Sequence, residues 1–245
     1  MSVDKQLVGY LPAGFPDLPG SIDAALALLD HGVTAIELGV PYSDPVMDGP
    51  VIQEAANAAL EGGFRLSQLF EAVAAIRRRS AAPVYTMTYW NPVLQYGVDR
   101  FADDFAAAGG TGLITPDITP DAAADWIAAS ERTGLDRVFL AAPTSTDERL
   151  RMIAEASRGW VYAVSTMGVT GAREDLDSKA RALVPRIRAA GADRVYVGIG
   201  ISTAEQVAEV WDYADGAIVG SAIVRAIQQD GAAGAARIAA ALSTR

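Results

Sequence analysis

Apolar and polar positions alternate in two different ways along the chain. Short runs rich in β-branched and aromatic residues are followed by longer Ala- and Leu-rich stretches whose apolar residues recur at helical spacing. The runs predict eight strands: Leu7–Tyr10, Thr34–Leu38, Val84–Thr88, Gly112–Thr115, Arg137–Leu140, Trp160–Val164, Arg194–Gly198 and Gly216–Val219.

The stretches between these strands predict eight helical segments, the second of them in two pieces. They are Ser21–His31, Val51–Leu60 with Ser67–Arg79, Asp99–Ala108, Pro120–Thr133, Asp147–Ser157, Ser178–Ala190, Thr203–Val210 and Ala222–Leu242. Strict alternation of strands and helices is typical of repeated βαβ units around a parallel sheet.

The length of the chain favours a closed barrel over an open sheet. Its 245 residues divide into eight units of about 31 residues, the size of one step in a (β/α)8 TIM barrel. A doubly wound open sheet is the alternative, but it usually has fewer strands and a Gly-rich phosphate turn after the first. Here that turn reads Pro12–Pro16, and no linker divides the chain. We expect residues 1–245 to form a single barrel domain.

Composition excludes several kinds of site. With no Cys and one His, the chain cannot build a disulfide framework, a thiolate zinc site, an iron–sulfur cluster or a metal site with two imidazoles, and we expect no zinc-dependent mechanism. The formal charge of −10 argues against nucleic-acid binding. We see no secretory signal and no apolar run of about 20 residues, so we expect a soluble, cytoplasmic protein without a membrane span.

The segment after the second predicted strand holds the first candidate residues. Active sites of TIM barrels lie at the carboxyl ends of the strands, where Glu37 stands between Ile36 and Leu38. Burial there would raise the pKa of Glu37 and suit it to acid–base catalysis, although a hydrogen-bonded structural acid fits the pattern as well. Asp44 and Asp48 follow in a Pro- and Gly-rich loop, where ordinary turn chemistry is the alternative.

Glycine-rich turns follow the last three predicted strands. They contain Gly171, Gly200 and the pair Gly220 and Ser221, which opens a helix. Because small residues and a helix N-terminus let backbone N–H groups approach an anion, three such turns at one end of a barrel indicate a phosphate site. Tight turns alone would explain each glycine taken singly.

Other side chains near the strand ends have two interpretations. Tyr162 would take part in acid–base chemistry or pack as a core aromatic residue. Tyr10, Met87 and Ile114 would line a pocket for a flat ring, or they would simply fill the barrel. Lys5 and Lys179, the two lysines of the chain, lie away from the strand ends, which argues against a Schiff-base mechanism, and His31 is expected to be structural.

The segment Glu37–Pro50 resembles the signature of the tryptophan synthase alpha chain family. The similarity continues in register through the segments Gly9–Asp17, Met87–Pro92, Gly112–Asp117, Gly168–Gly171, Gly200–Ser202 and Gly220–Val224. It covers the chain from Leu7 to about Val224 and is highly specific.

The resemblance implies a lyase that cleaves indole-3-glycerol phosphate to indole and glyceraldehyde 3-phosphate without a cofactor. It implies that Glu37 is the general acid–base, that Asp48 binds the ring N–H and that Tyr162 is the active-site tyrosine. By the same likeness, phosphate binding falls to the set Gly171, Gly200, Gly220 and Ser221.

The resemblance also implies a partner. Members of the family pair with a pyridoxal-phosphate beta chain in an assembly of two alpha and two beta chains. Pro41, Asp44 and Asn91 match the contact surface, though rigid turns would explain them as well. A stand-alone lyase that releases free indole, a non-catalytic activator of a beta chain and another phosphosugar isomerase remain alternatives.

Two departures from the family pattern accompany the resemblance. Relatives usually carry a helix before the first strand, whereas six residues precede Leu7 here, so we expect a barrel without that helix. The loop after strand six has Thr166 where many relatives have Arg, which predicts altered closure of that loop or altered coupling to the partner.

Overall fold

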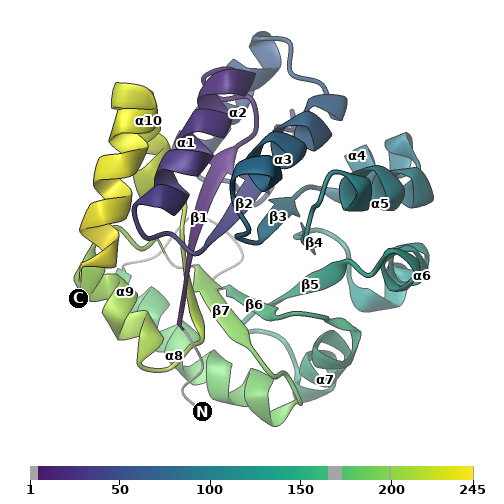
Figure 1. The fold of residues 1–245 in the computed structure, drawn as a ribbon. Coiled ribbons are helices and arrows are strands. Elements are labelled where there is room, and N and C mark those ends of the chain that lie inside the picture. Colours follow the sequence, from purple (N-terminus) through teal and green to yellow (C-terminus); the bar gives the residue numbers. More distant parts are fainter. Residues whose placement is uncertain (1–4, 165–172, 199, 245) are drawn as a thin grey trace.

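The chain forms a closed barrel of eight parallel strands, in the order β1 to β8, surrounded by helices (Figure 1). The computed structural model describes residues 5–164, 173–198 and 200–244. The strands are β1 (Gln6–Pro12), β2 (Ala35–Gly39), β3 (Val84–Met87), β4 (Gly112–Thr115), β5 (Asp136–Ala141), β6 (Val161–Val164), β7 (Val195–Gly198) and β8 (Gly216–Val219). All eight predicted strands are confirmed, and closure of β8 onto β1 excludes the open sheet.

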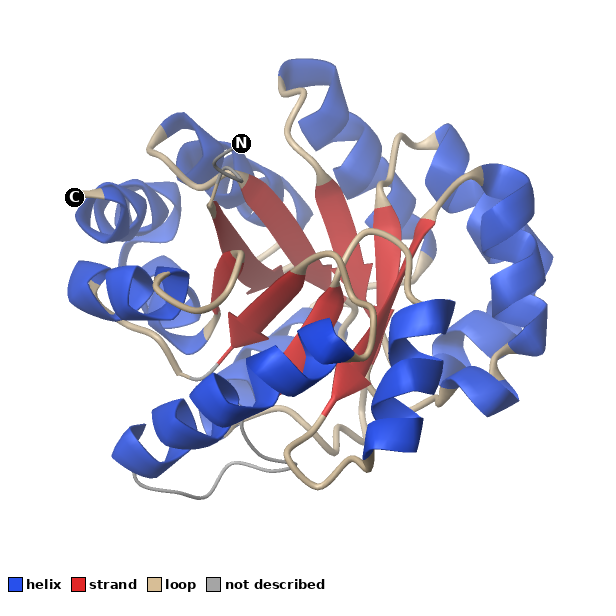
Figure 2. Cartoon of the chain, turned by 90° about the horizontal axis from the view of Figure 1, so that it is seen from below, coloured by secondary structure: helices blue, strands red, loops and turns tan. Residues whose placement is uncertain are grey.

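Helices connect the strands on the outside of the barrel (Figure 2). They are α1 (Leu18–Asp30), α2 (Pro50–Glu61), α3 (Ser67–Arg79), α4 (Trp90–Tyr96), α5 (Val98–Ala107), the 3₁₀-helix η1 (Pro120–Ala122), α6 (Ala124–Thr133), α7 (Asp147–Ala156), α8 (Arg173–Ala189), α9 (Ala204–Trp211) and α10 (Ser221–Ser243).

Two helix predictions were wrong in detail. Helix α4 was not predicted, because its seven residues bury only Val93 and are too few to show a period. Asn91, expected in a loop, therefore lies in the first turn of α4. The segment Pro120–Thr133, expected to be one helix, breaks at Ala123, whose φ of −103° and ψ of 23° are not helical.

Side chains at the helix starts explain several of the observed boundaries. The Asp17 carboxylate accepts a hydrogen bond from the Gly20 N–H at the start of α1, and Thr146 does the same for the Arg149 N–H at α7. At α9, Thr203 and Gln206 form a reciprocal capping box. These bonds satisfy amides that have no partner within the helix.

Two apolar cores hold the barrel. The inner core fills the barrel itself with alternate strand residues, among them the stacked rings of Trp160 and Tyr196, whose centroids are 4.4 Å apart. The larger outer core lies between the strands and the helices and includes Trp126, Phe101 and Phe105. The interior is therefore packed, and only the carboxyl ends of the strands are left to build a site.

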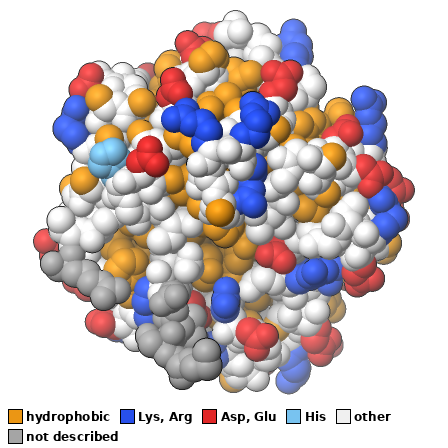
Figure 3. Space-filling model, in the orientation of Figure 1, with side chains coloured by type: hydrophobic (Ala, Val, Ile, Leu, Met, Phe, Trp, Pro, Cys, Tyr) orange, Lys and Arg blue, Asp and Glu red, His pale blue; other side chains and the backbone are white. Residues whose placement is uncertain are grey.

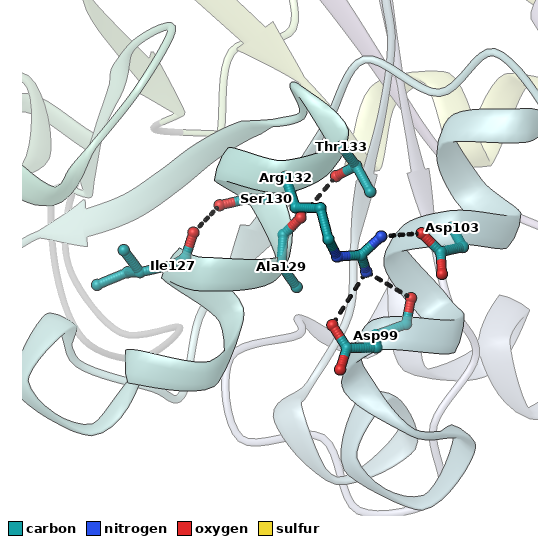
Figure 4. A network of polar contacts seen from close by, with 7 residues as sticks. All are labelled: Asp99, Asp103, Ile127, Ala129, Ser130, Arg132 and Thr133. Atoms are coloured by element: carbon teal, nitrogen blue, oxygen red, sulfur yellow. Dashed lines mark hydrogen bonds and ion pairs between the residues drawn. The ribbon is translucent and has the colours of Figure 1, made fainter.

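Polar contacts on the surface join neighbouring helices. Arg132 of α6 binds the carboxylates of Asp99 and Asp103 on α5 (Figure 4). Acidic and basic side chains are interspersed on the face seen in Figure 3. Within the described ranges, no helix has both the length and the apolar character needed to cross a membrane.

The first and last helices, α1 and α10, lie side by side on the outside of the barrel (Figure 1). Lys5 and His31 belong to the opposite end of the molecule from the strand carboxyl ends. Lys5 donates to the Ala214 carbonyl before β8, and His31 Nδ1 lies 2.8 Å from the Ala27 carbonyl at the end of α1. Lys5 thus lies away from the strand carboxyl ends, as expected, and the placement of His31 agrees with the structural role predicted for it.

Candidate active site

Glu37 is buried inside the barrel, near the carboxyl end of β2. Only 1% of its surface is exposed, and it pairs in register with Tyr10 of β1. Its Oε2 atom is fully buried and has no hydrogen-bond partner. Burial, and next the charge of Asp48, raise the pKa of Glu37 to about 8. Glu37 is therefore a carboxylic acid at neutral pH, able to give up a proton.

Asp48 reaches the same end of the barrel from the loop between β2 and α2. The loop ends at Gly49 and Pro50, which start α2, and the Gln53 side chain donates to the Asp48 carbonyl oxygen at 2.8 Å. Burial raises the pKa of Asp48 to about 6. At neutral pH the pair therefore consists of one ionised and one protonated carboxyl, as paired acid–base work requires.

Two tyrosines complete this layer of the barrel. Burial raises the pKa values of Tyr10 and Tyr162 well above the ordinary value, so both phenols stay protonated. Each hydroxyl lies over a glycine: a Cβ atom on Gly39 would stand 2.2 Å from the Tyr10 hydroxyl, and one on Gly198 would stand 2.4 Å from that of Tyr162. The two glycines leave the room that these hydroxyls occupy.

Apolar side chains line the same region. Met87 and Leu140 are partly buried and pack against the inner core. Met87 pairs in register with Ile114, which is fully buried, and Leu140 pairs with Tyr162. Sequence reasoning proposed Met87 and Ile114 but missed Leu140. Leu140 was the last residue of the fifth predicted strand, and alternation from Val138 would have pointed to it.

Gly200, Gly220 and Ser221 lie where two strands end. Gly200 has a φ of +70°, and nothing lies within 4 Å of a Cβ atom placed there. Gly220 precedes α10, and Ser221 is its first residue. The first amides of a helix have no partner within the helix and can bind an anion. Gly171, the fourth predicted phosphate residue, and Thr166 lie outside the described residues.

The residues predicted for a partner surface lie beside the acids. Pro41 is buried, whereas Asp44 is exposed and accepts a hydrogen bond from the Ser43 hydroxyl at 2.6 Å. Asn91 is exposed, and its Nδ2 lies 3.5 Å from the Tyr42 hydroxyl. Val46, 71% exposed, and Leu94, 53% exposed, are the large apolar side chains left open among the described residues.

Tyr89, at the start of α4, was missed by sequence reasoning although it lies in the segment Met87–Pro92. Its side chain is buried, and its hydroxyl oxygen accepts hydrogen bonds from the N–H groups of Val46 and Met47, at 3.1 and 2.9 Å. It thus holds the loop that carries Asp48. The described residues contain no cluster of His, Asp or Glu that could hold a metal ion.

A family model described as the tryptophan synthase alpha chain matches residues 2–244. The tryptophan synthase alpha chain of Leifsonia xyli subsp. xyli is 68% identical over 237 residues, which cover 97% of this chain and 91% of that protein. That of Mycobacterium avium is 56% identical over 225 residues, covering 92% of this chain and 83% of that one.

Solved structures agree with these sequence comparisons. A chain of Mycobacterium tuberculosis tryptophan synthase superposes with a TM-score of 0.92 at 53% identity, covering 98% of this chain and 91% of the other. A chain of the tryptophan synthase complex from Pyrococcus furiosus gives a TM-score of 0.89 at 35% identity and covers 99% of both chains.

Proposed function

Because the chain belongs to the tryptophan synthase alpha chain family, we propose that the strand ends hold a site that cleaves indole-3-glycerol phosphate, with Glu37 and Asp48 as its acid–base pair. The products are indole and glyceraldehyde 3-phosphate. The observation that carries the proposal is the pair itself, a buried carboxyl with a pKa of about 8 beside one with a pKa of about 6.

Glu37 acts first as an acid. Its carboxyl group donates a proton to C3 of the indole ring, which leaves the ring positively charged across C2 and N1. The Asp48 carboxylate accepts a hydrogen bond from the ring N–H and stabilises that charge. At the start of the reaction Glu37 must therefore be protonated and Asp48 ionised, as their two pKa values favour.

Glu37, now ionised, then acts as a base. It takes the proton of the hydroxyl on the carbon attached to C3, and the bond between that carbon and C3 breaks. The bonding electrons return to the ring, which becomes neutral indole, while the carbon becomes the aldehyde of glyceraldehyde 3-phosphate. Glu37 ends protonated, as it began. General acid–base catalysis of this kind contributes roughly 10²–10⁴-fold per group.

Apolar residues and a helix N-terminus supply the binding. Tyr10, Met87, Ile114 and Leu140 would surround the indole ring, with Tyr162 beside Glu37. The phosphate would lie against the backbone N–H groups at Ser221.

Changing Ser221 to Asp should raise KM about tenfold or more because it puts a like charge at the anion site. An unchanged KM in steady-state kinetics would contradict this placement.

The partner follows from the same family. We propose that the surface made by Pro41, Asp44 and Asn91 receives a tryptophan synthase beta chain, which consumes the indole. The exposed side chains of Val46 and Leu94 support this, because large apolar groups open to solvent are typical of a docking face. The Pyrococcus furiosus relative is described as part of a tryptophan synthase complex.

Indole release from indole-3-glycerol phosphate tests the proposal. The chain is assayed alone and with a matching beta chain. Slow release that rises strongly with the beta chain is the expected result. Fast release that the beta chain does not change would indicate a stand-alone lyase. No release from folded protein in either assay would overturn the proposed reaction.

The cytoplasmic location stays a prediction, which cell fractionation tests.

A further inference from the structure

The loop between β2 and α2 is held by a side chain from a neighbouring unit of the barrel. Val46 and Met47, which directly precede Asp48, donate their backbone N–H groups to the Tyr89 hydroxyl oxygen. A phenol oxygen accepts two hydrogen bonds at most, so these amides use its whole accepting capacity. The loop is therefore tied to the start of α4 by two bonds at one atom.

Tyr89 is itself fixed on several sides. Its side chain is 5% exposed, and its ring lies 5.1 Å from that of Tyr42, which belongs to the same loop. The next residue, Trp90, donates its backbone N–H to both carboxylate oxygens of Asp117, at 2.9 and 3.0 Å. Three loops at the barrel mouth, those after β2, β3 and β4, meet around this tyrosine.

We propose that Tyr89 is a positioning residue for the cleavage reaction, which holds the Asp48 carboxylate at the ring N–H through the backbone of Val46 and Met47. The proposal rests on the proposed function of Asp48. Tyr89 touches neither the substrate nor the reacting atoms. It acts through the loop, since a carboxylate displaced by about 1 Å can lose a large part of its catalytic effect.

Releasing the loop should also change the titration of Asp48. Burial is the cause of its raised pKa, so a loop that moves toward water should bring that pKa down. The groups that interact with its charge are Glu37 on β2 and the phenols of Tyr10 and Tyr89, and the Asp117 carboxylate on the loop after β4 acts on Tyr89. Replacing Tyr89 by Phe alters none of these carboxyls.

The test compares the tyrosines at the two ends of α4, Tyr89 just before its first residue and Tyr96 at its last. Tyr89→Phe removes the acceptor of the two loop amides. Tyr96→Phe is the matched control, because Tyr96 is the last residue of α4 and its hydroxyl donates to Asp104 of α5, not to the loop that carries Asp48. Both variants are assayed for indole release in complex with the beta chain, and Asp48 is titrated by carboxyl ¹³C NMR.

For Tyr89→Phe we expect kcat to fall about tenfold to a hundredfold, with KM changed about twofold or less. The pKa of Asp48 should fall below about 6, and the amides of Val46 and Met47 should exchange with solvent faster. Tyr96→Phe should keep the wild-type kcat, the wild-type Asp48 titration and the wild-type amide protection.

A second variant weakens the support of Tyr89 without changing Tyr89 itself. Asp117→Ala removes the acceptor of the Trp90 N–H but leaves the Tyr89 hydroxyl in place. We expect a smaller fall in kcat and a smaller fall in the pKa of Asp48, in the same direction. This variant keeps the proposal testable if Tyr89→Phe fails to fold, which thermal unfolding would reveal.

An unchanged kcat and an unchanged Asp48 titration in folded Tyr89→Phe would overturn the proposal, as would an equal loss of kcat in Tyr96→Phe. Failure of the proposed function looks different, since wild-type protein would then release no indole. The NMR titration and the amide exchange do not need turnover, so they decide the role of Tyr89 in that case too.

Discussion

Buried carboxylates at the two ends of the barrel differ in whether they have hydrogen-bond and ion-pair partners. At the amino end of the strands, Asp215 is 6% exposed and binds Arg188 through both oxygens, at 2.9 and 3.0 Å, and the Val195 N–H. At the carboxyl end, Glu37 is equally buried, yet its Oε2 has no hydrogen-bond partner, and a second carboxylate raises its pKa further.

The difference separates stability from function. A buried carboxylate that is paired and hydrogen-bonded offsets its own desolvation. One that is left unpaired beside another acid costs stability, and such a cost is typical of a site that needs an unusual pKa. Asp136, half-buried at the amino end of β5, is intermediate: it accepts a hydrogen bond from Tyr85 at 3.0 Å and lies near Arg158, yet burial still raises its pKa.

The largest expected effect is the loss of activity in Glu37→Gln. An amide cannot exchange a proton with C3 or with the glycerol hydroxyl, so indole release should fall by about 10²–10⁴-fold or more. The assay is steady-state indole release in complex with the beta chain. Turnover close to wild type would remove Glu37 from the mechanism.

The same variant should be at least as stable as wild type, and the size of the gain depends on pH. The pKa of Glu37 is raised on folding to about 8, so the unfolded chain releases this proton more easily than the folded protein, and stability falls as the pH rises from the unfolded pKa toward 8. Glu37→Gln removes this cost. Its melting temperature should exceed that of wild type at pH 8–9, and the difference should shrink toward pH 4.

Asp48→Asn should come next, with a fall in kcat of about a hundredfold or more. In wild type, kcat/KM should follow a bell with limbs near pH 6 and pH 8, one for each member of the pair. Removing the Asp48 charge also removes the second cause of the raised Glu37 pKa. The alkaline limb of the residual activity should therefore move to lower pH, and a fixed limb would contradict the coupling.

Asp215→Ala probes the opposite end of the barrel. It leaves the Val195 N–H without its acceptor and Arg188 without its ion pair, so it should cost about 1–3 kcal/mol of unfolding free energy. Urea unfolding measures the loss. Because Asp215 lies far from the strand carboxyl ends, kcat should stay at the wild-type value. A large fall in kcat in fully folded variant protein would contradict the assignment of stability to the amino end and catalysis to the carboxyl end.

Arg132→Ala gives the smallest expected effect. Its ion pairs with Asp99 and Asp103 are exposed and screened by water, so the loss of unfolding free energy should be small, well below that of Asp215→Ala. The comparison with Asp215→Ala in the same urea titration shows what burial adds to an ion pair. A loss as large as that of Asp215→Ala would mean that the contact between α5 and α6 depends on this arginine.

Periodicity and motif spacing were sufficient for the fold. The runs around Leu7, Ile36 and Ile218 are short, apolar and bounded by polar or glycine residues, and the strands appear at these runs, within two residues of the predicted ends. Helix α4 was not predicted because its seven residues, with one buried side chain, are too few to show a helical period. The break at Ala123, between η1 and α6, was not predicted because the helical spacing of apolar residues continues across it.

What the sequence by itself determined was the barrel, the family and the identity of the candidate acids, because each depends on local order or on residues adjacent in the chain. Tertiary structure alone decided that Glu37 is unpaired and that Tyr89, 41 residues after Asp48, anchors the loop before it. Burial, charge coupling and hydrogen bonds between loops depend on distances in space, and closing the barrel is what creates those distances.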